Sequence, residues 1–326
     1  MRRTSLGLIA VVALLMTAAC GGDDESTDGS AGGATGDSGE LTPVTVGVIP
    51  IVDTAAIWLG VEQGIFEEHG LDVQLEVAQG GAAIVPGVIS DEFQFGFSNV
   101  TSLLLASHEG LPLQIVAPGN SSTGEVGADI GAVVTMPGTG IESAADLNGR
   151  TVAVNTLNNI GDSTIRNVVE LDGGDPSDIN FVEMPFPDMP AAVVNGQVDA
   201  AWILEPFLTI TMDQGATPVS WNFVETDPDL MIAAYFTSKP YAQENPEVVE
   251  AFSAAMAESL AYAEENPDEA RAILSTYTEL DPAVQEAIVM PRFEPEVDTD
   301  SVELLAELAQ KYGMVDELID TSALLP

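Results

Sequence analysis

The chain has 326 residues, enough for one large or two modest domains, and its hydrophobic content of 46% is ordinary for a globular protein. Asp and Glu number 52 against 8 Lys and Arg, so the formal net charge is −44. Such a charge repels nucleic-acid phosphates and excludes DNA or RNA as a partner. One cysteine and two histidines leave little for a disulfide framework, a redox pair or a zinc site.

The carboxylates are dispersed through the chain and do not form one tail, which is typical of a solvated acidic surface. At ~1 M salt the Debye length is ~3 Å, so repulsion between exposed carboxylates is largely screened. We therefore expect a halophilic protein from a salt-rich habitat. The densest acidic run, residues 23–25, lies in a predicted tether and gives little support to a cation-binding surface.

Residues 1–20 predict a lipoprotein signal peptide. Arg2 and Arg3 precede an apolar run at 6–16, which is about half the length that spans a bilayer. Small residues lead to Cys20, the pattern of a bacterial lipid attachment site, so we expect lipidation of Cys20. The alternative is a plain cleaved signal with a chance cysteine. Residues 21–43 are rich in Gly, Ser, Thr and Asp and predict a flexible acidic tether.

Strands and helices are predicted to alternate from residue 44 onward. Short apolar runs indicate strands, and the turn or capping residues between them indicate helix starts. The predicted strands before residue 160 are 44–49, 71–77, 93–97, 113–117, 132–135 and 152–155. Helices are expected after Asp53 or Thr54, after Gly80, and after Asn99.

The stretch 180–207 predicts a βαβ unit. An apolar run at 181–184 is followed by a short loop and a helix that Asp188 can cap. Residues 198–204 are too few for a globular helix and fit a buried strand. Glu205 follows that strand directly, at the carboxyl end where α/β proteins bind their ligands.

Two further strands are expected, at 215–220 and 231–237, and the rest of the chain is predicted to be helical. Three pairs place a capping residue before a proline at the first helical position: Asn245-Pro246, Asn266-Pro267 and Asp281-Pro282. Apolar residues at helical spacing predict two buried faces. These faces comprise Val248, Phe252, Met256 and Leu260, and then Val302, Leu305, Leu308 and Tyr312.

Several motifs, taken in order, resemble the NMT1/THI5-like, SsuA/TauA-type substrate-binding proteins of ABC transporters. They are the Gly-Ile-Phe followed by GLDV at 64–73, the DLNGRTV at 146–152 and the NGQVDAAWILEPF at 195–207. The resemblance covers nearly all of residues 44–325. It implies an α/β, periplasmic-binding-protein-like type II fold, with two α/β lobes joined by two crossing segments and a ligand cleft between them.

The resemblance also implies a division of the chain. The first lobe would comprise residues 44–130 and a helical second part at 234–326, and the other lobe residues 131–233. The crossings would lie near Gly131 and Ala233. The implied protein is a monomer on the outer face of the cell membrane, held there by its lipid anchor. Its lobes would close on a small-molecule solute and deliver it to ABC permease and ATPase subunits, without a catalytic residue, cofactor or metal.

Three alternatives to this function stay open. One is a sulfonate-, taurine- or nitrate-type binding protein of the same family, and another is a sensor lipoprotein that does not transport. The third is a THI5-like pyrimidine synthase. Resemblance to that enzyme class would imply an intracellular protein with a Schiff-base lysine, an active-site histidine and a cysteine-rich motif. The predicted export signal and the two lysines, both late in the chain, fit poorly with these features.

Candidate ligand-binding residues lie in the loops that lead from strands into helices. Helix starts offer free backbone N–H groups, and aromatic rings can stack on a flat ligand. The candidates are Pro50, Asp53, Trp58, Ser98, Asn99, Asn155, Thr156, Asn159, Ser163, Phe186, Trp202 and Glu205. For Ser98, Asn99 and Ser163 a capping role is the alternative, and for Trp202 it is core burial. Glu205 either accepts from a ligand N–H or bonds backbone at the hinge.

The positions of the lysine and arginine residues restrict the class of ligand that we expect. Those that follow the signal are Arg150, Arg166, Lys239, Arg271, Arg292 and Lys311. Only Arg166 lies near a predicted pocket helix, and Asp162 four residues earlier predicts a local salt bridge there. Because oxyanion sites usually contain a guanidinium group, we expect a neutral or zwitterionic solute, such as a pyrimidine or thiamine precursor, rather than a sulfonate.

Overall fold

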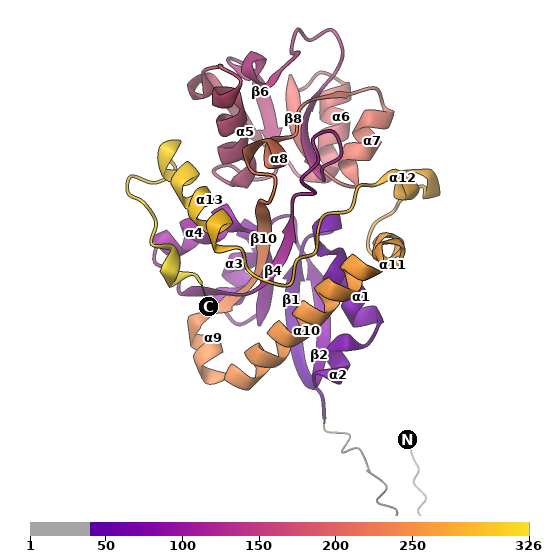
Figure 1. Cartoon of the computed structure of the whole chain (residues 1–326), viewed down its shortest axis with the longest axis vertical. Coiled ribbons are helices and arrows are strands. Elements are labelled where there is room, and N and C mark those ends of the chain that lie inside the picture. The colour runs from indigo at the N-terminus through magenta and orange to yellow at the C-terminus, as the bar shows by residue number, and fades with distance from the viewer. Residues whose placement is uncertain (1–39, 326) are drawn as a thin grey trace, which may run out of the picture. The chain divides into compact units, whose positions relative to one another are not determined.

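Two five-stranded sheets organise residues 40–325, the part of the chain that the computed structural model describes (Figure 1). The strand order is β2-β1-β3-β10-β4 in the first sheet and β7-β6-β8-β5-β9 in the second. The first sheet contains β1 (Thr42–Val48), β2 (Leu71–Val77), β3 (Phe95–Asn99), β4 (Leu113–Ser121) and β10 (Met231–Ser238). The second contains β5 (Gly131–Thr135), β6 (Thr151–Val154), β7 (Asn180–Glu183), β8 (Ala200–Leu204) and β9 (Thr217–Ser220). We call the first sheet with its helices lobe 1 and the second lobe 2; the predicted two-lobed α/β fold is confirmed.

One strand in each sheet runs against its neighbours. In lobe 1, β10 pairs antiparallel with β3 and β4, and in lobe 2, β5 pairs antiparallel with β8 and β9. The start of β10 therefore lies beside the carboxyl ends of β3 and β4, where Ala233 pairs with Asn99 and Asn120. The predicted boundary at residue 233 thus falls inside a strand of lobe 1, and the preceding link lies between Thr226 and Met231.

Helices flank both sheets. Lobe 1 carries α1 (Ala55–Glu62), α2 (Ile65–Glu68), α3 (Gly81–Ile89) and α4 (Val100–His108), and lobe 2 carries α5 (Ile160–Leu171), α6 (Met189–Val194), α7 (Phe207–Asp213) and α8 (Asn222–Thr226). The C-terminal part adds α9 (Lys239–Glu244), α10 (Pro246–Glu265), α11 (Pro267–Ala272), α12 (Pro282–Ala287) and α13 (Thr299–Lys311). The 3-10 helices are η1 (Val52–Thr54), η2 (Ala144–Leu147), η3 (Pro176–Asp178), η4 (Phe186–Asp188), η5 (Ile273–Thr276) and η6 (Thr321–Ala323). Within residues 40–325, no helix has both the length and the apolar character to cross a membrane.

The long helix α10 packs on lobe 1 through the apolar face that its spacing predicts. Phe252, Met256 and Leu260 are fully buried, and the ring of Phe252 stacks on that of Phe95 in β3 with centroids 3.8 Å apart. Burial of each such side chain stabilises the fold by roughly 1.5–3 kcal/mol. This packing attaches the C-terminal helices to a sheet formed mostly by the first hundred or so residues.

Two predicted helix caps are confirmed and four are not; one of the four is Thr54, which precedes α1 and makes no capping hydrogen bond with its side chain. Asn99 accepts a hydrogen bond from the Ser102 N–H and begins α4, and Asp281 caps α12 in the same way. Asp188, Asn245 and Asn266 make no capping hydrogen bond with their side chains. The last two instead donate backward to carbonyls in the preceding helix, because short links join α9 to α10 and α10 to α11.

Some predicted boundaries are wrong by a few residues. Strand β1 begins at Thr42, inside the predicted tether, because Thr42 and Pro43 pair with the start of β2. Strand β4 continues to Ser121, four residues beyond its predicted end, since β10 supplies it with a partner. The predicted signal peptide and Cys20 lie outside the described residues.

Candidate functional site

A cavity of about 350 Å³ lies between the two lobes, within the usual size range of small-molecule sites. Lobe 1 lines it with the segments that follow β1 and end β2: Ile49, Pro50, Ile51, Val77, Ala78 and Gln79. Lobe 2 lines it around η4 and at the start of α7: Pro185, Phe186, Pro187, Asp188 and Phe207. We call this the outer pocket. Its walls are mostly apolar, and it contains the candidates Pro50 and Phe186.

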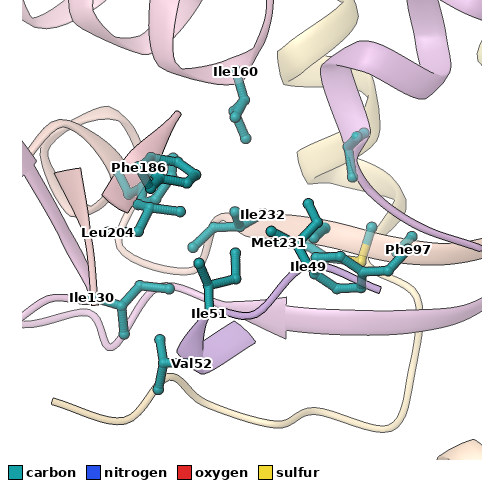
Figure 2. Close-up of a cluster of buried hydrophobic side chains, with 14 of the residues drawn as sticks. Ile49, Ile51, Val52, Phe97, Ile130, Ile160, Phe186, Leu204, Met231 and Ile232 are labelled. Carbon is teal, nitrogen blue, oxygen red and sulfur yellow. The ribbon is translucent and has the colours of Figure 1, made fainter. Parts of the chain in front are cut away.

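A smaller cavity of about 20 Å³, which we call the inner cavity, shares Ile49, Ile51 and Phe186 with the outer pocket. Its other lining residues are Asp53, Phe97, Asn99, Asn155, Ile160, Trp202, Leu204, Phe223, Ile232 and Ala233. Figure 2 shows the apolar part of this lining, where Ile51 and Ile232 of lobe 1 lie toward Leu204 and Phe186 of lobe 2. Four of the predicted candidates, Asp53, Asn99, Asn155 and Trp202, bring polar atoms to this apolar surface.

Asp53 lies in η1, which follows β1 after three residues, and is 2% exposed. The Asn120 side-chain amide donates to its Oδ1 at 3.1 Å, whereas Oδ2 has no hydrogen-bond partner within residues 40–325. Burial raises the pKa of Asp53 to about 7, and the hydrogen bond from Asn120 opposes that shift. A buried carboxyl oxygen without a partner is costly, and Asp53 is among the residues that line the inner cavity.

Trp202 lies in β8 with 1% of its surface exposed. Its ring packs between Phe186 and Phe223, with both centroid distances 5.6 Å, and against the backbone of Gly161 in α5. The indole Nε1 has no acceptor in the described part of the chain. Trp202 is therefore a core residue whose surface also forms part of the inner cavity.

The two asparagines face the inner cavity from opposite lobes. Asn99 uses its side-chain oxygen to cap α4, and the Asn155 side-chain oxygen accepts from the Asn159 amide at 2.7 Å. Thr156 lies beside Gly80, where an added Cβ would be 3.4 Å from the threonine Oγ1. The lobes therefore come within van der Waals distance at this edge of the cleft.

Three of the candidates that line neither cavity have clear local roles. The Asn159 side-chain oxygen accepts from the backbone N–H groups of Gly161 and Asp162, which caps α5. The Ser163 hydroxyl donates to the Ile160 carbonyl one turn earlier. The Trp58 ring stacks on that of Tyr277, with centroids 4.6 Å apart.

Ser98 is fully buried near the end of β3 and lines neither cavity. Its hydroxyl lies against the backbone of Gly81, where an added Cβ would be 1.9 Å from the Ser98 Oγ. The hydroxyl has no hydrogen-bond partner among residues 40–325. A glycine at 81 is thus needed for α3 to approach β3.

Glu205 lies at the end of β8 and bonds protein rather than lining either cavity. Its carboxylate accepts from the Thr209 N–H at 3.0 Å, from the Thr209 hydroxyl at 2.7 Å and from the Val289 N–H at 3.4 Å. Its backbone carbonyl accepts from the Val52 N–H of lobe 1 at 3.2 Å. Burial raises the pKa of Glu205 to about 7, although its hydrogen bonds act in the opposite direction. Glu205 therefore bonds backbone, as in one of the two alternatives that the sequence left open, and a role at a hinge stays a prediction.

Neither cavity has a lysine or arginine in its lining. The predicted ion pair forms, with Arg166 Nε 2.8 Å from Asp162 Oδ1, and Arg166 also donates to the Pro176 carbonyl. Arg292 and Lys311 pair with carboxylates elsewhere. An anionic ligand in the cleft would therefore depend on backbone N–H groups and neutral side chains.

Sequence reasoning missed Asn120 and Ile232. Asn120 lies 67 positions after Asp53 in the sequence and contacts it because β4 extends beyond its predicted end. Ile232 lines the inner cavity from the start of β10. The signal available for Asn120 was its position in residues 119–131, a glycine-rich segment that follows a predicted strand.

A sequence model described as NMT1/THI5 like matches residues 52–270 of the chain. The formylaminopyrimidine-binding protein of Halalkalibacterium halodurans is 24% identical over 304 residues, which cover 91% of this chain and 84% of that protein. A Bacillus subtilis protein named for aliphatic sulfonate binding is also 24% identical, over 87% of this chain and 81% of its own length.

Solved structures share the fold. The alkanesulfonate-binding protein SsuA of Xanthomonas axonopodis pv. citri, bound to MOPS, superposes with a TM-score of 0.74 at 16% identity. The match covers 88% of this chain and 99% of the SsuA chain. At this identity the likeness establishes the two-lobed architecture and leaves the ligand to be argued from the cavities.

Proposed function

This chain belongs to the NMT1/THI5-like family, and we propose that it is the solute-binding component of an ABC importer. The observation that carries the proposal is the outer pocket, whose walls come from both lobes and leave about 350 Å³ between them. Separation of the lobes would open both cavities, and a ligand that contacts both walls would favour the closed state. The chain would then present its closed form to permease and ATPase subunits.

The solute we propose is small, organic and either neutral or zwitterionic, such as a pyrimidine. Two observations support this class: neither cavity has a cationic lining residue, and one relative binds a formylaminopyrimidine by its name. Sulfonate or nitrate binding is the second candidate, because sulfonate-binding proteins are also among the relatives. Helix starts can bind such anions through backbone N–H groups alone.

We also propose that Cys20 carries the lipid that holds the protein at the outer face of the cell membrane, and that it acts there as a monomer. The signal-like residues 1–20 and the polar stretch behind them support this placement. Replacement of Cys20 by serine should release the protein from washed membranes into the soluble fraction. Retention of the variant on the membrane would contradict lipid anchoring while leaving solute binding intact.

We infer that the bound solute leaves unaltered. The experiment is to incubate the purified full-length protein in detergent with a small-molecule extract of its host, remove unbound material, and identify retained compounds by mass spectrometry. Two results together would support a binding protein: the released compound has the same mass as the compound in the extract, and the radius of gyration of the protein in solution scattering is smaller with the compound bound. A product of changed mass, or no retained compound and no change in shape, would contradict it.

A matched pair of variants sharpens this experiment. Phe186→Asp introduces a charge between the two cavities and should abolish retention of the compound. Leu171→Asp changes an exposed apolar side chain at the last residue of α5, which lines neither cavity, and should leave retention unchanged.

A further inference from the structure

A third chain segment contacts the two links that connect the lobes. The first link is residues 122–130, between β4 and β5, and the second is residues 227–230, between α8 and β10. The third segment, residues 288–293, lies in the stretch that joins α12 to α13 (Figure 1). Within it, Arg292 forms an isolated antiparallel bridge with Ser121, the last residue of β4, through N–H to oxygen distances of 3.0 and 3.2 Å. The third segment therefore lies where the first link leaves lobe 1.

The side chain of Arg292 bonds both links. Its Nε donates to the Ser122 carbonyl of the first link at 2.6 Å. Its Nη2 donates to the Pro228 carbonyl of the second link at 3.1 Å, and its Nη1 donates to the Asp229 carboxylate at 3.1 Å. A guanidinium group presents its five N–H donors in one rigid plane, so it can hold two carbonyls at a fixed separation. At the same point the links bond each other, because the Ser122 N–H donates to the Leu230 carbonyl at 2.9 Å.

The third segment is itself attached to lobe 1 on both sides of Arg292. The Phe293 N–H donates to the carboxylate of Glu264 in α10 at 2.7 Å. The side chain of Arg271 in α11 donates to the Ile288 carbonyl. Since α10 packs on the sheet of lobe 1, these contacts fix Arg292 relative to that lobe. Arg292 therefore holds the lobe 1 ends of both links in place.

Asp129 joins the same links on the side of lobe 2. This carboxylate is fully buried and accepts from the Val224 N–H of α8 at 3.1 Å and from the Ile130 N–H at 2.9 Å. It also accepts from the Ser122 hydroxyl at 2.8 Å. The two links are thus connected twice, by Arg292 where they leave lobe 1 and by Asp129 where they meet lobe 2.

Resting on the proposed function, we propose that Arg292 is a positioning residue for lobe closure, which clamps both links to lobe 1 so that the lobes rotate about one axis. The backbone rotation would take place between this clamp and Asp129, at residues 123–128 and 225–227. Arg292 lines neither cavity, so it acts on solute binding only through the links. Without the clamp the links would move separately, and the solute-free protein would adopt a wider range of lobe orientations.

Hydrogen exchange and solution scattering of the purified full-length protein, without any solute, test this clamp. In Arg292→Ala the Ser122 amide should exchange about tenfold faster, because the carbonyls on both links lose the donors that hold them together. The radius of gyration should also increase. The amides of β6, in the sheet of lobe 2, are the internal reference and should exchange at the wild-type rate.

Two further variants separate the clamp from a general loss of stability. Arg166→Ala is the matched control, because Arg166 also bonds one carboxylate and one carbonyl, those of Asp162 and Pro176, within lobe 2 alone. It should lower the melting temperature but leave the Ser122 exchange rate and the radius of gyration unchanged. Arg292→Lys keeps the positive charge without the planar fork, and should reproduce most of the effect of Arg292→Ala on both measurements. Melting curves verify that each variant is folded, and if Arg292→Ala is not, Arg292→Lys supplies the test.

The outcomes are distinct from those of the proposed function. Faster Ser122 exchange and a larger radius of gyration in both Arg292 variants, but not in Arg166→Ala, would support the clamp. Wild-type values in Arg292→Ala, equal changes in Arg166→Ala, or wild-type behaviour of Arg292→Lys would overturn it. None of these measurements involves a solute, so the retention experiment with host extract decides the proposed function separately.

Discussion

The carboxylate of Glu205 accepts a hydrogen bond from the backbone N–H of Val289, 84 residues later in the chain. The same carboxylate accepts two hydrogen bonds from Thr209 at the start of α7. The buried side chain of Glu205 thus accepts hydrogen bonds from both α7 and a C-terminal segment. Its backbone carbonyl accepts a hydrogen bond from the Val52 N–H of lobe 1. A group in this position influences how the two lobes are held together.

The first prediction concerns this contact. Glu205→Ala leaves the donors of Thr209 and Val289 without their acceptor and should lower the free energy of unfolding by about 2–3 kcal/mol, as measured by urea denaturation. The control is Asp213→Ala, an exposed carboxylate at the end of α7, which should change stability by less than about 0.5 kcal/mol. An equal loss of unfolding free energy in the two variants would mean that the hydrogen bonds of Glu205 do not stabilise the fold.

The second prediction concerns pH and Asp53. Its folded-state pKa, about 7, lies above the value of 3.8 for an unperturbed Asp. Between these two pH values the unfolded chain loses a proton that the folded protein keeps, so stability from this group is greatest below pH 4 and falls as the pH rises toward 7. Asp53→Asn should abolish this fall and make the variant more stable than the wild type at pH 8, by about 2–4 kcal/mol.

Urea denaturation of both proteins at pH 5 and pH 8 measures this difference. Asp172→Asn is the control, because hydrogen bonds from Ser143 and the Ala145 N–H lower the pKa of Asp172, so this carboxyl titrates below the measured range and its effect on stability should be the same at pH 5 and pH 8. Stability from Asp172 is present above the unfolded pKa and is lost as the pH falls. A wild-type protein and Asp53→Asn variant with parallel pH profiles would show that the Asp53 carboxyl does not titrate in this range.

The local features of this fold could be predicted from the sequence, because they depend on residues close together in the chain. The Asn99 cap, the ion pair of Asp162 with Arg166, and the buried stripe of Phe252, Met256 and Leu260 all lie within one element or one turn. The order of short apolar runs and helix starts also predicted alternating strands and helices, whereas the division into two lobes was implied by the resemblance to the family.

The candidate site was predictable only in part, because its contacts join distant segments. Asp53 could be placed after a strand, but its partner Asn120 depends on the length of β4, which β10 determines by pairing with it. Trp58 looked available for a flat ligand, and it stacks on Tyr277 from the C-terminal part instead. Such partners cannot be deduced from spacing along the chain, since tertiary packing selects them.

The third prediction concerns Gly161, which lies against the face of Trp202. An added Cβ would be 2.4 Å from the indole Cε3, closer than non-bonded carbons can approach. Although alanine is the better helix former, Gly161→Ala should therefore lower the free energy of unfolding by about 1–3 kcal/mol and weaken ligand binding, because the indole must shift at the inner cavity.

Chemical denaturation and calorimetry measure the two effects of Gly161→Ala. The matched control is Gly80→Ala, where the new Cβ would be 3.4 Å from the Thr156 Oγ1, an ordinary contact. That variant should lose less than about 1 kcal/mol. If both glycine variants behave alike, the close packing of Gly161 on Trp202 has no energetic consequence for the site.

The fourth prediction follows from the net charge of −44, which is spread over the chain. At low ionic strength the exposed carboxylates repel one another in the folded state more than in the expanded unfolded state, and molar salt screens this repulsion. The melting temperature should therefore rise, by roughly 5 °C or more, between 0.05 and 2 M KCl, which corresponds to a gain of about 2 kcal/mol for a protein of this size. Sucrose at equal osmolality is the control, because it leaves the charges unscreened and should raise the melting temperature less. A melting temperature that stays level in KCl, or that rises equally in sucrose, would mean that the acidic surface is not what limits stability at low salt.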